Sequence, residues 1–245
     1  MKKLMTICAV AVVVLVGIVL TSTASATILG TVNIQNHNNG LSDIGQLWST
    51  SLGSESGWSF YTGVYSWTNT HATGTTGLGS QVPDWGFCIE LPQEPYNGWQ
   101  NVVPLDEAPL PAQYGTPTGI TKANAIRELW GRDFDPTWAT GANRQMAEAF
   151  GAAIWEIVYE TDTGPWNVTS GTGFHASIEQ AAAANLWLSQ LTGDTAHFAK
   201  NLVATSTILG QDYVVQVPGP VTVPEPATIC LLGLGALTVM RRQKA

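Results

Sequence analysis

Cysteine is scarce in this 245-residue chain, and this scarcity limits the ways in which the fold can be stabilised. Of the three cysteines, Cys8 and Cys230 lie in apolar segments near the two ends, so the middle of the chain contains Cys88 alone. A single cysteine cannot form an internal disulfide, which excludes the disulfide-stabilised class of small exported domains. The remaining explanations for Cys88 are a buried inert thiol, a reactive thiol or an intermolecular disulfide.

Signatures of metal and cofactor sites are also missing. The four histidines show no metal-ligand spacing, so we expect no metal site. The sequence has no glycine-rich phosphate loop, no Ser/His/Asp pattern and no basic patch. We therefore expect no cofactor and no nucleic-acid partner.

Carboxylates occur in close pairs, but nothing around them indicates catalysis. The pairs are Asp106 and Glu107, Asp133 and Asp135, and Glu156 and Glu160. A glycoside hydrolase needs two carboxylates placed across a scissile bond, whereas these pairs lack a neighbouring nucleophile, base or family signature. Acidic loops and a solvated helix face account for them. We expect no enzymatic activity, and a polysaccharide-acting enzyme ranks third among the hypotheses.

The first 26 residues have the pattern of a secretory signal peptide. Two lysines precede an apolar run over residues 4–20, and the small residues Ala24 and Ala26 then supply a cleavage site. We expect cleavage after Ala26, which leaves Thr27 as the first residue. The alternative is an uncleaved membrane anchor, for which the apolar run is almost long enough.

The carboxyl-terminal end contains a second apolar segment. Residues 229–240 form an apolar run that is followed by Arg241 and Arg242. This run is short for a membrane-spanning helix, which needs about 20 residues. Positive charge after the run favours retention of this end in the cytoplasm, with the middle of the chain outside. The segment is then either a weak permanent anchor or a temporary anchor that is removed.

Within this tail, Pro224, Glu225 and Pro226, the apolar run rich in glycine and leucine, and the basic end resemble the PEP-CTERM sorting signal. The resemblance implies a Gram-negative bacterium that secretes exopolysaccharide. It also implies transient anchoring in the inner membrane and processing by an exosortase, a transpeptidase-like membrane enzyme. We therefore divide the chain into three parts. These are a signal peptide (1–26), an extracytoplasmic domain (27–219) and a sorting tail with a short transmembrane segment (220–245).

The middle of the chain is strongly acidic once both ends are set aside. Five of the 10 basic residues and one of the 18 acidic residues lie in the ends, so the middle carries 5 basic and 17 acidic residues, a net charge of −12. Such a domain repels nucleic acid and anionic lipid at long range. Charged residues make up only 11% of the chain, and Ser, Thr, Asn and Gly take their place.

Strand-forming and turn residues dominate both ends of this middle part. They predict strands over residues 27–34, 86–91 and 212–217, and one or two strands over residues 58–67. Residues 92–119 contain six prolines and show no periodicity, which predicts an extended surface loop.

Helical periodicity appears between these strands. It predicts helices over residues 121–130, 143–159 and 175–191, the first of them capped by Thr121. Strands at both ends with helices between them predict an α+β fold, with antiparallel β-structure and an inserted helical subdomain.

Two of these segments resemble the paired motifs of thioester domains, which occur in bacterial surface adhesins and in some PEP-CTERM proteins. Cys88 lies in the strand Phe-Cys-Ile-Glu-Leu, and Ala153, Ile154 and Trp155 lie on the central helix. In that family the strand cysteine is joined to a helix glutamine two positions before the Ala-Ile-Trp. A partner's amine attacks this thioester and forms a covalent bond. The resemblance implies a thioester-domain-like fold with an adhesive role.

The glutamine position of this motif is occupied by Gly151, which has no side chain to acylate. Gln145 lies six residues earlier, rotated by about 120° around the helix, and is a poor substitute. Gln93 and Gln100 follow Cys88 in the chain, but no motif supports either of them. We expect no working thioester and interpret Cys88 as a buried, inert thiol. A thioester with a different glutamine is the alternative.

Ten tryptophans are the remaining unusual feature, since exposed tryptophans stack on sugar rings. We expect surface positions for Trp58, Trp67, Trp99 and Trp138, and core positions for the helical Trp130, Trp155 and Trp187. The leading hypothesis is an exported, non-enzymatic protein of the cell surface or extracellular matrix, with an exosortase and either exopolysaccharide or a surface ligand as partners. The second hypothesis is a carbohydrate-binding component of the exopolysaccharide matrix.

Overall fold

The computed structural model describes residues 26–37, 42–49, 58–70, 74–110, 119–161 and 165–221. Ala24 of the expected signal cleavage site lies outside these residues, as do Pro224, Glu225 and Pro226 of the sorting motif and the expected short transmembrane segment. In the part of the chain that the structure does describe, no helix has the length and apolar character needed to cross a membrane.

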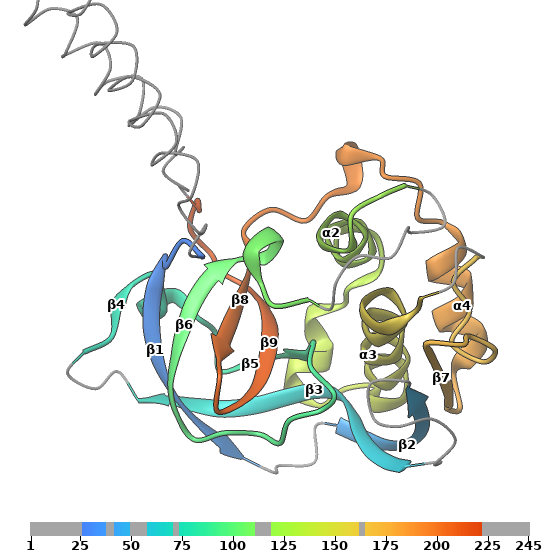
Figure 1. Cartoon of the computed structure of the whole chain (residues 1–245), viewed down its shortest axis with the longest axis horizontal. Coiled ribbons are helices and arrows are strands. Elements are labelled where there is room, and N and C mark those ends of the chain that lie inside the picture. Colours follow the sequence, from blue (N-terminus) through green and yellow to red (C-terminus); the bar gives the residue numbers. More distant parts are fainter. Residues whose placement is uncertain are drawn as a thin grey trace, which may run out of the picture.

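Six antiparallel strands form a barrel, which lies on the left in Figure 1. Its strands follow one another around the barrel in the order β1, β6, β8, β9, β5 and β3, and β1 also pairs with β3, which closes the ring. The strand bounds are β1 Gly30–His37, β3 Trp58–Thr70, β5 Trp85–Cys88, β6 Gly98–Pro104, β8 Leu202–Thr207 and β9 Gly210–Gln216. Closure pairs both edges of every barrel strand, so the barrel itself has no open edge.

The long strand β3 carries the sheet beyond the barrel. Its second half pairs with β5 from Val64 onward, and its first half pairs with β2 (Ser42–Ser49) up to Gly63. Strand β7 (Phe174–Ser177) then pairs with β2. Gly63 stands at the division between the two halves with a φ of 109°, a conformation that favours glycine. At the opposite end of the strand order from β2 and β7, the short strand β4 (Thr76–Gly77) pairs with β1.

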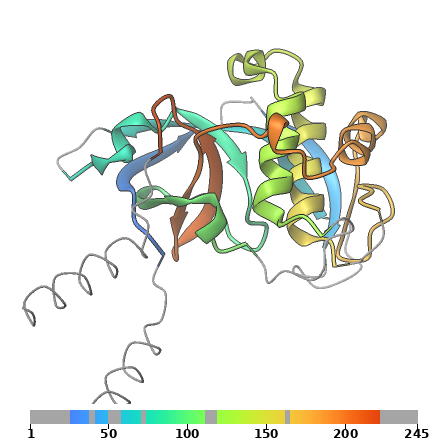
Figure 2. The same ribbon diagram turned by 90° about the horizontal axis from the view of Figure 1, so that it is seen from above.

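Three helices cover this extension and one side of the barrel (Figure 1 and Figure 2). They are α2 (Lys122–Asp133), α3 (Arg144–Tyr159) and α4 (Ala181–Ser189). The central helix α3 packs against β3, β2 and β7 and against both other helices. The described residues also include four 3-10 turns: η2 Leu78–Gln81, η3 Leu105–Glu107, η4 Pro136–Thr140 and η5 Thr195–His197.

Aromatic side chains join the barrel to the helices. Phe87 of β5 contacts Trp130 of α2 at a ring-centroid distance of 5.6 Å and Phe150 of α3 at 5.0 Å. The cluster continues outward to Trp138 and Trp187. Full burial of one such side chain stabilises a fold by about 1.5–3 kcal/mol, so the cluster makes one common core of the two parts.

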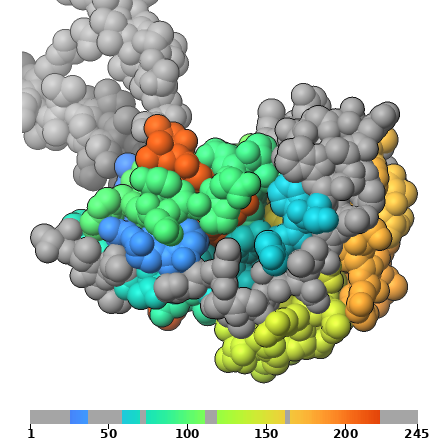
Figure 3. Space-filling model, turned by 90° about the horizontal axis from the view of Figure 1, so that it is seen from below, coloured from blue at the N-terminus to red at the C-terminus, as the bar shows by residue number. Residues whose placement is uncertain are grey.

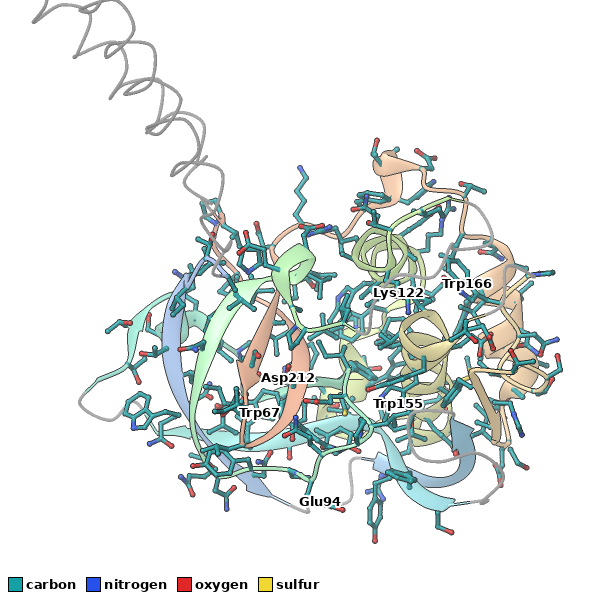
Figure 4. All side chains as sticks on the ribbon, viewed as in Figure 1. Trp67, Glu94, Lys122, Trp155, Trp166 and Asp212 are labelled. Atoms are coloured by element: carbon teal, nitrogen blue, oxygen red, sulfur yellow. The ribbon has the colours of Figure 1, made fainter. Side chains whose placement is uncertain are left out.

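A second aromatic group fills the barrel, where Figure 4 shows Trp67. The rings of Trp67 and Tyr213 lie 5.0 Å apart, and Tyr65 lies 5.6 Å from Tyr213. The indole N–H of Trp67 donates to the carbonyl oxygen of Pro83 at 2.9 Å. This barrel therefore has a packed interior.

The structure confirms the predicted α+β class, with antiparallel strands and helices inserted between them. The helix over residues 143–159 is confirmed, and the helix at 121–130 is found with Thr121 as its cap, whose Oγ1 accepts from the N–H of Asn124 at 3.2 Å. The strands expected at 27–34, 58–67, 86–91 and 212–217 correspond to β1, β3, β5 and β9 with shifted bounds.

Two secondary-structure predictions are wrong. The loop expected at residues 92–119 contains β6. This strand can form because the only proline within it is its last residue, Pro104, and the other prolines of the segment lie outside the strand. The single helix expected at 175–191 is a strand followed by a helix, since Phe174–Ser177 pairs with β2 and α4 begins only at Ala181. Strands β2 and β8 were not anticipated from the sequence.

Candidate functional site

Cys88 is the last residue of β5 and lies where the barrel meets α3. Its side chain is buried, and its Sγ donates to the carbonyl oxygen of Glu90 at 3.0 Å. The backbone N–H of Glu90 in turn lies 3.3 Å from Sγ. Both interactions are local to the turn that follows the strand, so the thiol is part of the turn's own hydrogen bonding.

Burial determines the protonation of this thiol. It raises the pKa of Cys88 far above the ordinary value, because a thiolate in this position would lose its hydration. Trp155 of α3, shown in Figure 4, interacts with the thiol and partly opposes the shift. Its indole N–H has no hydrogen-bond partner of regular geometry among the described residues. Because the thiolate is the nucleophilic form, a thiol held protonated is unreactive.

Gly151 lies one helical turn before Trp155 and packs directly against β3. A Cβ atom at this position would lie 2.7 Å from Oγ1 of Thr62 and 2.8 Å from the backbone nitrogen of Gly63. The Thr62 hydroxyl also donates to the carbonyl oxygen of Glu148 on α3 at 3.3 Å. The position that corresponds to the thioester glutamine therefore lies at a close contact between α3 and β3, which leaves no room for a side chain.

The other glutamines considered from the sequence lie apart from this contact. Gln145 is exposed, as expected for the polar side of its helix. Gln93 donates through Nε2 to Oε1 of Glu90 at 2.6 Å. Gln100 is buried on β6, which is separated from β5 by β8 and β9 in the barrel order. Among the described hydrogen bonds, none links one of these three glutamines to Cys88.

An acidic pocket lies beside the β8–β9 hairpin, with a volume of about 340 Å³. Of the described residues that line it, Glu90, Glu107 and Asp212 are charged and none is basic. Ser206, Thr207, Gln93 and Asn101 add polar groups to the wall, and Ala26, Ile28 and Ile208 are among its apolar lining residues. The pocket therefore suits positively charged or hydrogen-bond-donating groups.

Asp212 is the most perturbed carboxyl group of this pocket. Its side chain is buried, and this burial, together with the nearby Glu90 carboxylate, raises its pKa to about 7. The N–H of Thr207 (2.9 Å) and the hydroxyl of Ser206 (3.1 Å) donate to its oxygens and partly oppose the shift. Burial also raises the pKa of Glu90. The pair can bind or release a proton near neutral pH.

Other carboxylates hold the helices together, which the sequence did not indicate. Glu128 of α2 is fully buried and accepts from the backbone N–H groups of Thr192 (3.0 Å) and Gly193 (2.7 Å). Arg132 donates to the same carboxylate at 2.9 Å. Glu128 thereby fastens α2 to the segment after α4, and its negative charge is balanced by these donors.

Glu156 and Glu160 fasten the segment after α3 in the same way. Oε1 of Glu156 accepts from the N–H of Asn167 at 2.7 Å, and Oε1 of Glu160 accepts from the N–H of Gly173 at 3.1 Å. Both side chains are buried, so the solvated helix face expected for them is wrong. The segment after α3 folds back over the end of the helix and covers them. The ammonium group of Lys122, labelled in Figure 4, is buried at the same place and donates to the carbonyl oxygen of Val158.

Asp106 and Asp135, from the remaining acidic pairs, have structural partners. Asp106 forms an ion pair with Arg127, with 2.5 Å between Oδ2 and Nη2, and the Arg127 hydrogen bonds lower the pKa of Asp106. Asp135 caps η4 by accepting from the N–H of Thr137 at 2.8 Å. Asp133 is half-buried, and its burial raises its pKa. Among the described residues, no group of three or more His, Cys, Asp or Glu side chains is placed to hold a metal ion.

The tryptophan predictions have mixed outcomes. Trp130, Trp155 and Trp187 lie in the core as expected, and Trp99 is exposed as expected. Trp67 and Trp138 are buried, so the surface positions expected for them are wrong: one fills the barrel and the other joins the aromatic cluster. The side chain of Trp58 lies outside the described residues.

The buried thiol yields a prediction for the mass of the exported chain. Because Cys88 is protonated and Gly151 offers no acyl group, we expect no loss of ammonia, which would lower the intact mass by about 17 Da. Mass spectrometry under non-reducing conditions measures this directly. A deficit of this size that disappears in Cys88→Ala would contradict the inert thiol and would establish a thioester with another glutamine.

The perturbed carboxyl of Asp212 yields a prediction for stability. Its folded pKa is raised, so its contribution is largest at acidic pH and is lost as the pH rises from about 4 through about 7. We expect the free energy of unfolding to fall by about 4 kcal/mol over this range, as measured by denaturant melts, since the pKa is raised by about three units and each unit contributes about 1.4 kcal/mol. Asp212→Asn keeps an acceptor for Thr207 and should flatten the profile, whereas Glu179→Gln, at an exposed position, should not. A wild-type slope in Asp212→Asn would assign the effect to another group.

Comparisons with known proteins identify the end of the chain. Residues 222–244 match the PEP-CTERM protein-sorting motif. The searches of curated proteins and of solved structures found no match, so no relative supports the resemblance to thioester domains, which stays a prediction. The matched motif indicates an exported protein that is transiently anchored in the membrane and processed by an exosortase.

Proposed function

We propose that this chain is a non-enzymatic protein of the cell surface or extracellular matrix of a Gram-negative, exopolysaccharide-producing bacterium, with an adhesive role. The observation that carries the proposal is the sorting motif at residues 222–244, directly after the folded domain. In this proposal the signal peptide is removed after Ala26, the domain folds outside the cytoplasm, and an exosortase processes the tail at the Pro-Glu-Pro.

The arrangement of the described ends supports this topology. The first and last described residues lie close together at one end of the barrel (Figure 1 and Figure 3). Leu29 accepts from the N–H of Leu78, and a Cβ at Gly219 would contact Gln81, so both ends border η2. The signal peptide and the sorting tail are therefore attached at the same end of the domain. In this proposal that end faces the membrane.

The boundary between domain and tail supports processing next to a folded domain. The N–H of Val217 donates to the carbonyl oxygen of Asn201 at 3.0 Å, and the N–H of Val221 lies 3.4 Å from Oδ1 of the same residue. The domain is thus held together up to the residue before the matched motif. A cut near Pro224 would release the domain with its last strand intact.

The thiol geometry supports a non-catalytic role for the motif that resembles a thioester. Cys88 is buried and protonated, and Gly151 is required by the contact with β3. In this proposal the thioester-domain-like architecture serves as a scaffold, and adhesion depends on non-covalent contacts of its surface.

Substitution of the sorting motif tests the proposal. In an exosortase-bearing host, we expect the wild-type chain in the extracellular fraction without its tail. A chain with Pro224→Ala, Glu225→Ala and Pro226→Ala should stay in the membrane fraction at nearly full abundance, because the exosortase can no longer recognise it. Fractionation followed by immunoblotting and mass spectrometry measures both, with Pro220→Ala as the control. A wild-type chain found in the cytoplasm with residues 1–26 attached would overturn the proposal.

A second candidate function is carbohydrate binding, and one surface favours it. Trp99 on β6 is 42% exposed and is paired with Asn33 on β1. Thr31, Asn101 and Gln35 lie on the same two strands and are at least partly exposed. An exposed indole among amide and hydroxyl groups suits a sugar ring, which stacks on the aromatic face and hydrogen-bonds at its edge.

Trp99→Ala tests this second candidate. If the surface binds glycans, the substitution should weaken co-sedimentation of the exported chain with the host's own exopolysaccharide by about tenfold, since one stacking contact contributes about 1–2 kcal/mol. Tyr61→Ala removes an even more exposed aromatic side chain (55%) from β3 and should leave binding unchanged. Equal retention of the wild-type and Trp99→Ala chains would exclude this surface as the glycan site.

A further inference from the structure

The backbone N–H of Thr27 is hydrogen-bonded to the carboxylate of Glu107. In the proposed processing, this nitrogen becomes the amino terminus of the exported chain. The N–H of Thr27 donates to Oε2 of Glu107, and the Thr27 hydroxyl donates to Oε1 at 3.2 Å. Both carboxylate oxygens are therefore directed at the same residue. Thr27 is the residue that follows the expected signal cleavage site.

The neighbouring chain fixes Thr27 in this place. The N–H of Leu29 donates to the carbonyl oxygen of Val102 at 2.7 Å, and Gly30 pairs with Val102 in the sheet. Residues 27–29 thus extend β1 along β6 towards η3, which carries Glu107. This pairing of β1 with β6 places Thr27 next to Glu107, so the position of Thr27 is set by the residues that follow it in the chain.

The adjacent carboxylate is already occupied. Asp106 is paired with Arg127 through two hydrogen bonds of 2.8 and 2.5 Å. The two successive acidic residues of η3 therefore have different partners: Asp106 holds a guanidinium group of α2, and Glu107 holds the start of the domain.

Among the described residues, no basic side chain lines the pocket beside Thr27. Ala26 and Ile28, on either side of it, line the acidic pocket together with Glu90, Glu107 and Asp212. A cation formed at Thr27 would lie at the edge of three carboxyl groups and would lower their mutual repulsion.

We propose that Glu107 is the binding site for the mature amino terminus, so that removal of the signal peptide creates an ion pair between the Thr27 ammonium group and Glu107. This inference rests on the proposed export and on cleavage after Ala26. Hydrolysis of the Ala26–Thr27 bond consumes one water, leaves a carboxylate on Ala26 and converts the Thr27 amide nitrogen to an ammonium group. One neutral N–H donor becomes three charged donors, and charge-assisted hydrogen bonds are about twice as strong as neutral ones.

The same cleavage changes the pocket. Ala26 is one of its lining residues, so its departure with the signal peptide opens the pocket on that side. The ammonium group takes its place at the edge. The mature domain then differs from the precursor both in the shape and in the charge of this pocket, although its fold is the same.

Competitive acetylation of the exported, signal-cleaved chain tests the inference. Trace isotopic acetic anhydride at a series of pH values reports the pKa of the Thr27 amine through the labelled amino-terminal peptide, with the Lys200 peptide as internal reference. We expect Glu107→Gln to lower the pKa of this amine by roughly one unit, because the amine loses its paired carboxylate. Asp194→Asn, which removes the exposed carboxylate of the residue that caps η5, should leave this pKa unchanged.

The outcomes separate this inference from the proposed function. An amino-terminal peptide that begins at a residue other than Thr27 would overturn the cleavage site and this inference together. A peptide that begins at Thr27, with the same amine pKa in the wild type and in Glu107→Gln, would overturn the ion pair and leave export intact. Equal decreases in Glu107→Gln and Asp194→Asn would also overturn it, because the effect would then come from net charge alone.

Discussion

The close contact between α3 and β3 is the constraint on which the arrangement of this domain depends. Gly151 has no room for a Cβ against Thr62 and Gly63, and Gly63 is the residue at which β3 passes from the barrel to its extension. With α3 held there, Phe150 reaches the aromatic cluster on β5, and Trp155 lies at Cys88 one turn later. The glycine that makes this packing possible also lacks the side-chain acyl group that a thioester needs. The same position therefore cannot satisfy both the close packing and the thioester chemistry.

Buried carboxylates play two different roles, and their hydrogen-bond donors decide which. Glu128 is surrounded by two backbone N–H groups and a guanidinium group, which compensate for its lost hydration and make it a fastener between segments. Asp212 has one backbone N–H and one hydroxyl, and it faces a second carboxyl group, Glu90. A charge there is under-compensated, so the group binds a proton more readily. An acidic domain with few basic residues can bury both kinds only because the backbone supplies most of the donors.

Local patterns were sufficient for some elements and insufficient for others. Helix α3 follows from its own periodicity, and the Thr121 cap follows from its position before α2. Strand β7 was missed because Phe174–Ser177 is extended only through its pairing with β2, which lies more than 120 residues earlier in the chain. At the site, the proximity of Cys88 and Trp155 could be expected from the resemblance to thioester domains. The burial of Glu156 and Glu160 could not, since their donors belong to a segment with no periodic signal.

The position of β9 has a mechanical consequence while the chain is transiently anchored through its carboxyl end. Strand β9 runs directly towards that end and is hydrogen-bonded on one side to β8 and on the other to β5. Tension applied at the tail therefore enters the domain through a strand with two neighbours, and both ladders must shear before the strand can leave. An edge strand would instead peel away one hydrogen bond at a time. The barrel is thus built to bear a load along the direction in which its anchor would pull.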